Sequence, residues 1–361
     1  MKQKDVCSEK STVSLTLIGD FFCSMKSDSN ERALIEKYLS SKIHPIINFE
    51  GSFETNTFEK KSIRLASDPS ILSSLGNCTI SLANNHVLDY QEKGLHYLMQ
   101  ELDKNSIPYF GVNSNSTKID NFRIIDFDGI RVCFLGFGAK NEECIEPTSD
   151  APGILDFNRS NLNASIKALD PAEFDYLILY AHIGYEFEKY PLPLHVGLCR
   201  EAIDLGVDLV YCSHTHCLQP YELYDEKYIF YGLGNFYFSA NRDGYPVDSD
   251  VGAMVSICLS RENHNVSLAG VEKITYKRPV PGLSIEIFSD YEKLWILDVI
   301  SLNDYSRNYS ANRTRKKNPR PILYYDCPLS NYIKYFVWKL IVDITGALGI
   351  RKIIKQLLRW Q

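Results

Sequence analysis

Two histidines, His214 and His216, lie one residue apart after an apolar run in the stretch YCSHTHCLQP. Imidazole nitrogens are common metal ligands, and alternating positions of an extended segment place both side chains on one side. The spacing therefore indicates two ligands for one metal ion or for two adjacent ions. The alternative is a pair of polar residues in a turn. We interpret the flanking Cys212 and Cys217 as small buried apolar residues rather than as ligands.

Together with these two histidines, further side chains of the ligand type occur at or just past the ends of five expected strands. The whole set is Asp20, Asn48, Glu50, Asn84, Asn85, His86, His182, His214 and His216. Ligands of open α/β sheets bind beyond the carboxyl ends of the strands, so these five strands predict one shared metal site. The set contains no thiolate, which favours Zn, Mn, Fe or Mg. Taken singly, each has a structural alternative: a Gly-Asp turn, a helix cap after Asn84, or a buried structural histidine at position 182.

Alternating strands and helices must position these side chains. We expect strands within the segments 11–22, 44–51, 77–86, 107–113, 174–184, 207–216, 227–239 and 251–260. The first strand is expected to end at Gly19-Asp20, and the segment 207–216 to include the exit loop of its strand. A hairpin is expected over 122–138 with its turn at Asp128-Gly129. Helices are expected over 29–43, 69–76, 91–106 and 192–206. This alternation is typical of an α/β fold, and the late β-structure suggests two packed sheets.

The whole chain has 361 residues and a formal net charge of −6, which does not favour nucleic acid as a partner. Its first residues contain no apolar run of the signal-peptide kind, and no apolar stretch is long enough for a spanning helix. We therefore expect a cytoplasmic protein whose ten cysteines are reduced.

The last part of the chain differs in composition. We divide the sequence into a tail over 1–11, a main domain over 12–280, an extension and polar basic linker over 281–328, and an amphipathic helical tail over 329–361. In that last tail, Ile and Leu recur at helical spacing between Lys and Arg residues. Two interpretations stay open: peripheral attachment to the anionic inner face of the membrane, or docking on the domain or a second subunit.

Six segments resemble, in order, the motifs of one known family. They are SLTLIGD, NFEG, SLANNHVLDY, YAHIGYEFE, GVDLVYCSHTHCLQPYE and YGLGNFYFS, between Val13 and Ser239. The sequence is similar here to the bacterial CapA-like capsule and poly-gamma-glutamate synthesis proteins of the calcineurin-like metallophosphatase superfamily. The resemblance implies a four-layer α/β/β/α sandwich with a two-metal site at the strand ends. We expect the C-terminal segment to add a helical extension to this α/β fold.

The resemblance also implies roles for single residues. The metal ligands would be Asp20, Glu50, Asn85, His182, His214 and His216, with Glu50 as the bridging carboxylate. His86 would be the catalytic histidine. Phe22 stands where many superfamily members have a histidine ligand, so the second of two divalent ions is expected to be weakly held. Glu186 is interpreted as a replacement ligand or a catalytic base, with a solvated loop carboxylate as the alternative.

The implied chemistry is hydrolysis by a metal-bound hydroxide, with His86 as general acid. We expect a phosphoesterase acting on a phosphorylated or polymeric small-molecule or glycan substrate in capsule, exopolysaccharide or poly-gamma-glutamate synthesis. One alternative is an amide-bond or ligase-associated polyglutamate enzyme. The other is a non-catalytic, metal-stabilised subunit of a membrane synthase complex. Nothing in the fold alone chooses among them.

Overall fold

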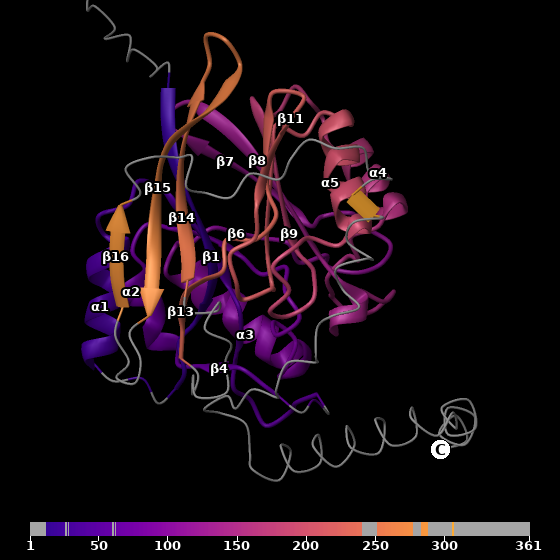
Figure 1. Ribbon diagram of the computed structural model, residues 1–361. Helices are drawn as coiled ribbons and strands as arrows, with labels where there is room; N and C mark the ends of the chain where they lie inside the picture. The colour runs from indigo at the N-terminus through magenta and orange to yellow at the C-terminus, as the bar shows by residue number, and fades with distance from the viewer. Residues whose placement is uncertain are drawn as a thin grey trace, which may run out of the picture.

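The computed structural model describes residues 12–25, 27, 29–59, 61, 63–239, 251–276, 283–287 and 305–306. Two β-sheets face each other, and helices cover their outer sides (Figure 1). The predicted α/β sandwich of four layers is therefore confirmed. The predicted C-terminal helical extension lies outside the described residues.

The first sheet has eight strands in the order β16-β15-β14-β1-β2-β5-β6, with β13 also paired to β1. Its parallel part contains β1 (Thr12–Phe22), β2 (Pro45–Phe49), β5 (Thr79–Ser81), β6 (Tyr109–Phe110) and β13 (Asn235–Phe238). An antiparallel part follows, with β14 (Val251–Ser260), β15 (Asn265–Tyr276) and β16 (Leu283–Ile287). Because β16 pairs with β15, this sheet includes residues beyond the domain boundary predicted at 280.

The second sheet has six strands in the order β11-β12-β10-β9-β8-β7. These are β7 (Phe122–Phe127), β8 (Ile130–Gly138), β9 (Tyr176–His182), β10 (Leu209–Ser213), β11 (Tyr221–Tyr224) and β12 (Lys227–Phe230). The predicted hairpin is confirmed, since β7 and β8 are joined by Asp128 and Gly129 with φ of 52° and 92°. A small separate sheet pairs β3 (Ser52–Phe53) with β4 (Ala66–Ser67).

The helices are α1 (Ser29–Leu39), η1 (Pro69–Ile71), α2 (Leu72–Leu75), α3 (Gln91–Lys104), η2 (Lys140–Glu142), α4 (Arg159–Ala168) and α5 (Pro193–Asp204). Helix α4 was not predicted. Its side chains are mostly polar, and its buried residues are only Leu162 and Ser165, which leaves little helical periodicity to detect. Its start is nonetheless capped, because the Asn158 side chain accepts a hydrogen bond from the amide of Asn161.

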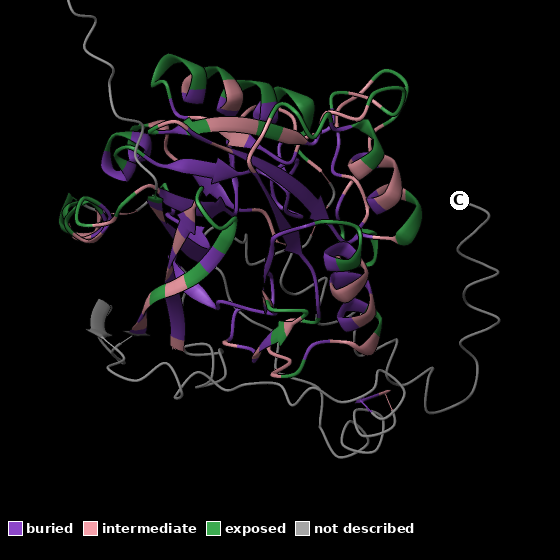
Figure 2. Ribbon diagram, turned by 90° about the horizontal axis from the view of Figure 1, so that it is seen from above, coloured by how far each residue is buried: buried purple, intermediate pink, exposed green. Residues whose placement is uncertain are grey.

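The core has two main parts. One lies between the two sheets and under α1 to α3, and the other lies between the second sheet and helices α4 and α5. Viewed from above, the central strands are buried, β7 and β15 include exposed positions, and the helices turn exposed faces outward (Figure 2). Buried Tyr305 belongs to the second part, and its hydroxyl donates to the carbonyl of Pro191 at 2.7 Å.

The described residues contain no helix that is both long and apolar enough to span a membrane. The predicted tail over 329–361 is outside them, so its interpretation as a membrane or protein contact stays a prediction. The same holds for the predicted boundaries at 11 and 328.

Candidate metal centre

The predicted ligands lie where strands of both sheets end. Asp20 belongs to β1, Glu50 follows β2 directly, and Asn85 lies in the turn after β5. These three come from the first sheet. From the second sheet come His182, the last residue of β9, and the His214–His216 turn after β10. The centre is therefore assembled between two sheets rather than along the edge of one.

Strand β1 does not end at Asp20, as the sequence suggested, but continues to Phe22. Asp20 lies instead at an irregularity, because the pairing of β1 shifts register on both of its sides, against β2 and against β13. Such irregularities turn a side chain out of its regular alternation. Here Asp20 is paired with Asn48 of β2 and Asn235 of β13, and its carboxylate accepts from the Asn48 side chain at 2.7 Å.

The two histidines of the opening motif are not on an extended segment, so that part of the prediction is wrong. Strand β10 ends at Ser213, and His214 and His216 have φ of 93° and 52°. Positive φ is uncommon in residues other than glycine and is held by the surroundings. One such contact is the hydrogen bond that the His214 amide donates to Asp20 Oδ2 at 3.1 Å. The turn nevertheless brings the His216 ring to Asp20 and Glu50 and the His214 ring to His182.

One group of four donor atoms consists of His182 Nε2 and three atoms near it. This Nε2 atom lies 3.0 Å from Asn85 Oδ1, 3.1 Å from His214 Nδ1 and 3.9 Å from Glu50 Oε1. Two imidazole nitrogens, an amide oxygen and a carboxylate oxygen form a set that suits a divalent cation of the Zn, Mn or Fe type.

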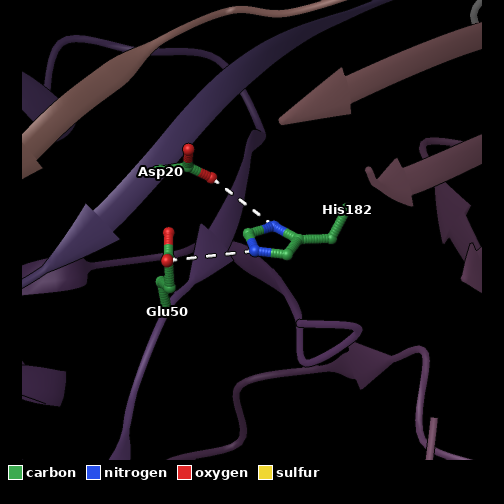
Figure 3. A group of neighbouring side chains, drawn as sticks. All are labelled: Asp20, Glu50 and His182. Atoms are coloured by element: carbon green, nitrogen blue, oxygen red, sulfur yellow. Dashed lines mark ion pairs between the residues drawn. The ribbon is translucent and has the colours of Figure 1, made fainter. Parts of the chain in front are cut away.

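A second group lies around His216. Its Nε2 is 3.6 Å from Glu50 Oε1, and its Nδ1 is 3.5 Å from Asp20 Oδ2. Glu50 therefore adjoins both groups, which is the arrangement that a bridging carboxylate requires. Asp20, Glu50 and His182 each offer one ligand atom, and these atoms lie within 4.8 Å of one another. Figure 3 shows the two carboxylates facing the two nitrogens of the His182 ring.

The electrostatics of Glu50 test whether these residues fit a metal ion. Glu50 is 1% exposed, and among the described residues neither of its carboxylate oxygens has a hydrogen-bond partner. Burial and then the charge of Asp20 raise the pKa of Glu50 well above its ordinary value. Burial likewise raises the pKa of Asp20 to about 6, against the hydrogen bond from Asn48. A buried anion without a counter-charge is costly, and a bound cation would offset that cost, so the residues fit.

His182 has the protonation state that coordination needs, whereas the surroundings of His214 favour its protonated form when no metal is bound. Burial, followed by the charges of His214 and His216, holds the pKa of His182 well below its usual range. His182 is therefore neutral near pH 7 and keeps a lone pair for a metal. For His214, burial lowers the pKa, but the contact with Glu142 and the charges around it outweigh burial and raise it.

The residues behind the ligands were missed by the sequence analysis. His182 Nδ1 lies 3.0 Å from the hydroxyl of Tyr180, and His216 Nδ1 lies 2.9 Å from Asn235 Oδ1. His214 Nε2 is 3.5 Å from Glu142 Oε2. A ligating histidine commonly donates its other N–H to such an acceptor, which fixes the ring and its tautomer. Asn235 belongs to the quoted YGLGNFYFS motif and could have been found there, whereas no sequence pattern marks Glu142.

Phe22 occupies the position at which many members of the superfamily have a histidine ligand, and its side chain has no atom that could bind a metal. Its ring is fully buried and packs 5.3 Å from the ring of Phe238, which in turn lies 4.8 Å from His216. Hydrocarbon thus lines this side of the His216 group. The observation supports the expectation of a weaker second metal position, which stays a prediction.

The two predicted catalytic residues, His86 and Glu186, also lie at the centre. His86 Nδ1 contacts Asp89 Oδ2 at 2.6 Å, and His86 Nε2 lies 4.0 Å from Glu50 Oε1. Glu186 lies in the loop after β9 and is partly exposed. Burial of its carboxyl group raises its pKa, while the charges of His214 and His86 act in the opposite direction. Its role as ligand or base stays a prediction.

The chain matches known proteins over much of its length. The model of a family described as bacterial capsule synthesis protein PGA_cap matches residues 26–240. The capsule biosynthesis protein CapA of Bacillus anthracis is 27% identical over 249 residues, which are 64% of this chain and 61% of that protein. The PGA biosynthesis protein CapA of Bacillus subtilis is 27% identical over 46% of this chain and 44% of its own length. The chain therefore spans about half of these relatives.

Similar solved structures include the NAD nucleotidase of Haemophilus influenzae. It is 14% identical, with a TM-score of 0.44, and the match covers 84% of this chain and 60% of that one. A 5'-nucleotidase precursor from Thermus thermophilus is 13% identical, with a TM-score of 0.43, over 84% of this chain and 59% of its own.

Proposed function

Because this chain belongs to the PGA_cap family of bacterial capsule synthesis proteins, we propose that it is a metal-dependent phosphoesterase in the assembly of a cell-surface polymer. One observation carries the proposal. The buried carboxylate of Glu50, whose oxygens accept no hydrogen bond in the described part of the chain, lies between two groups of imidazole and oxygen donors. Such a cluster is unfavourable without a cation and fits divalent-metal chemistry with it.

The proposed metal ligands are Asp20, Glu50, Asn85, His182, His214 and His216. A divalent ion held there supplies the polarisation of a phosphoryl oxygen and the acidification of water that phosphoester hydrolysis needs.

The chain itself supplies the proton for the leaving group. With Nδ1 of His86 held by Asp89 at 2.6 Å, the other ring nitrogen, Nε2, is directed toward Glu50 and the centre. A proton on that nitrogen can pass to the oxygen of the departing alcohol, which is general acid catalysis.

The test is the hydrolysis of a panel of phosphosugars, nucleotides and γ-glutamyl amides by the Mn²⁺-loaded protein and its variants. His86→Ala should keep its metal and lose about 10²- to 10⁴-fold in turnover, the usual contribution of a general acid. The control is His96→Ala, on the exposed face of α3, which should match the wild type.

Three outcomes would count against the proposal. Full activity of His86→Ala on every ester would remove the role of His86. A wild type that binds metal but turns over no substrate would instead favour a non-catalytic subunit of a synthase. Cleavage of γ-glutamyl amides alone would favour the amide-bond alternative.

We also propose that residues 329–361 attach the protein to the inner face of the membrane. The support is the alternation of Ile and Leu with Lys and Arg between Ile350 and Arg359. Vesicles containing anionic lipid should carry the full chain, but not a chain ending at 328, in a flotation assay. Equal flotation of both chains would refute the attachment and favour docking on protein.

A further inference from the structure

A buried lysine reaches the turn that carries Asn85 and His86. Lys61 lies in the loop between β3 and β4, and its side chain is only 9% exposed. Its Nζ donates to Asp89 Oδ1 at 3.0 Å and to the main-chain carbonyl of Asn85. Lysine is seldom buried unless it is paired, so this position needs an explanation.

Asp89, the partner of Lys61, is fully buried and is held from three directions. Its Oδ2 contacts His86 Nδ1 at 2.6 Å and accepts from the main-chain amide of Leu65 at 2.8 Å. Its Oδ1 accepts from Lys61. Both oxygens are thus engaged, and the orientation of the carboxylate decides where the His86 ring points.

The segment that Lys61 contacts has no regular structure of its own. Strand β5 ends at Ser81, helix α3 begins at Gln91, and the residues between them form turns. Contacts from other segments therefore add to the turn's own hydrogen bonds, such as that from the His86 amide to Asn84 Oδ1, in holding Asn85 and His86 in place. Lys61 makes two such contacts with one ammonium group, to the carbonyl of Asn85 and to the carboxylate behind His86.

We propose that Lys61 is a positioning residue that fixes the Asn85–Asp89 turn, and through Asp89 aims the His86 ring at the leaving group. The part concerning the leaving group rests on the proposed phosphoesterase function. Without the ammonium group, Asp89 Oδ1 would be a buried carboxylate oxygen that has lost its partner, which is energetically unfavourable. We expect the carboxylate to rotate in order to find another hydrogen-bond donor. The hydrogen bond to His86 Nδ1 would be lost with that rotation.

A positioning role for Lys61 differs from simple stabilisation of the fold in how the loss of kcat on substituting Lys61 depends on the substrate. An alkyl phosphate has a poor leaving group and needs the proton of His86, whereas p-nitrophenyl phosphate has a good one and needs it little. A lysine acting through His86 should therefore matter far more for the alkyl ester. A lysine that only stabilises the fold should affect both esters alike.

The experiment compares full-length, Mn²⁺-loaded wild type with Lys61→Met, Lys61→Arg and Lys104→Met. The last is the control, since Lys104 is also ion-paired, to Glu101 at 3.1 Å, but on the exposed surface of α3. Lys61→Met should lose at least tenfold more kcat on the alkyl ester than on p-nitrophenyl phosphate. Lys61→Arg should recover most of that loss because its charge reaches the same carboxylate, and Lys104→Met should equal the wild type.

A second readout does not use turnover. This measurement uses Zn²⁺-loaded protein, because Zn²⁺ is diamagnetic and does not broaden nearby resonances as Mn²⁺ does. The ¹⁵N resonances of the His86 ring report whether its Nδ1 carries a held proton, and Lys61→Met should lose that signal while Lys104→Met retains it. Equal losses on both esters with an unchanged His86 resonance would overturn the proposal. If the wild type hydrolyses neither ester, the proposed function has failed, and the His86 resonance alone decides whether Lys61 positions the ring. Should Lys61→Met not fold, Lys61→Gln takes its place with the same criteria.

Discussion

The single side chain of Glu50 favours metal binding and lowers the stability of the folded protein when no metal is bound. It is buried beside Asp20, and within the described residues its oxygens lack hydrogen-bond partners. Burial and the neighbouring charge raise its pKa, so keeping this carboxyl group ionised in the metal-free protein costs stability. A carboxylate kept under this strain is typical of sites that bind a cation.

We therefore expect Glu50→Gln to be more stable than the wild type when both are free of metal at pH 7.5. The gain should be at least about 1.4 kcal/mol, the value of one unit of pKa shift. Because the pKa is raised in the folded state, the deficit of the wild type is full above that pKa and disappears as the pH falls toward 4.5, its ordinary value. Urea unfolding with a chelator from pH 4.5 to 8 measures the difference.

Glu36→Gln, on the exposed face of α1, is the control for that comparison and should show no such pH-dependent gain. Glu50→Gln should also fail to bind metal. A metal-free Glu50→Gln that is less stable than the wild type at pH 7.5 would contradict the electrostatic account of the centre.

At the scale of elements, a close approach of two backbones places Asp20. The main-chain amide of Asp20 donates to the carbonyl of Gly234 at 3.0 Å, and β13 begins at the next residue, Asn235. A Cβ atom on Gly19 would lie only 2.0 Å from that carbonyl oxygen. Glycine at position 19 is therefore required for β13 to lie beside β1, with Asn235 opposite Asp20.

Gly19→Ala should be destabilised by about 1–3 kcal/mol, since the two strands must separate to admit the methyl group. It should also bind metal more weakly because Asp20 and Asn235 move with their strands. The control is Gly270→Ala in β15, where the nearest atom to the new methyl would be 4.0 Å away. Thermal unfolding and metal titration measure both effects, and equal stability of the two variants would refute the close-approach argument.

At the scale of the whole molecule, the centre joins the two sheets. Asp20, Glu50 and Asn85 come from the first sheet, whereas His182 and His214 come from the second. A cation bound among them would be a link between the two sheets, absent from the unfolded chain. Metal binding should therefore stabilise the folded protein as a ligand that prefers the native state.

Removal of metal should accordingly lower the melting temperature of the wild type. At a free metal concentration 100 times the dissociation constant, the stabilisation should be about 2.7 kcal/mol. His214→Ala should lose metal and show no difference between metal and chelator, whereas His96→Ala on the exposed face of α3 should behave as the wild type. Elemental analysis measures the metal directly, and an unchanged content in His214→Ala would remove His214 from the ligands.

Local pattern was enough to predict much of the sandwich. The period of apolar residues predicted strands β1, β9 and β10, and Asp128-Gly129 predicted the hairpin, because both signals are contained in neighbouring residues. Residue type and position also predicted which side chains meet at the centre, since the ends of parallel strands share an edge. Helix α4 was not predicted because it buries only Leu162 and Ser165, which is too few residues to give a helical period of apolar side chains.

Only the tertiary structure decided how the side chains are aimed. The register shift at Asp20, the positive φ of His214 and His216, and the hydrogen bond to Asn235 depend on segments far apart in the chain. The contact of Lys61 with Asp89 depends on the packing of a loop against a turn. The sequence by itself determined which chemical groups are present and which strand ends carry them, because those properties are local. Their partners, orientation and protonation came from the packing of two sheets, because burial and hydrogen bonding exist only after distant segments meet.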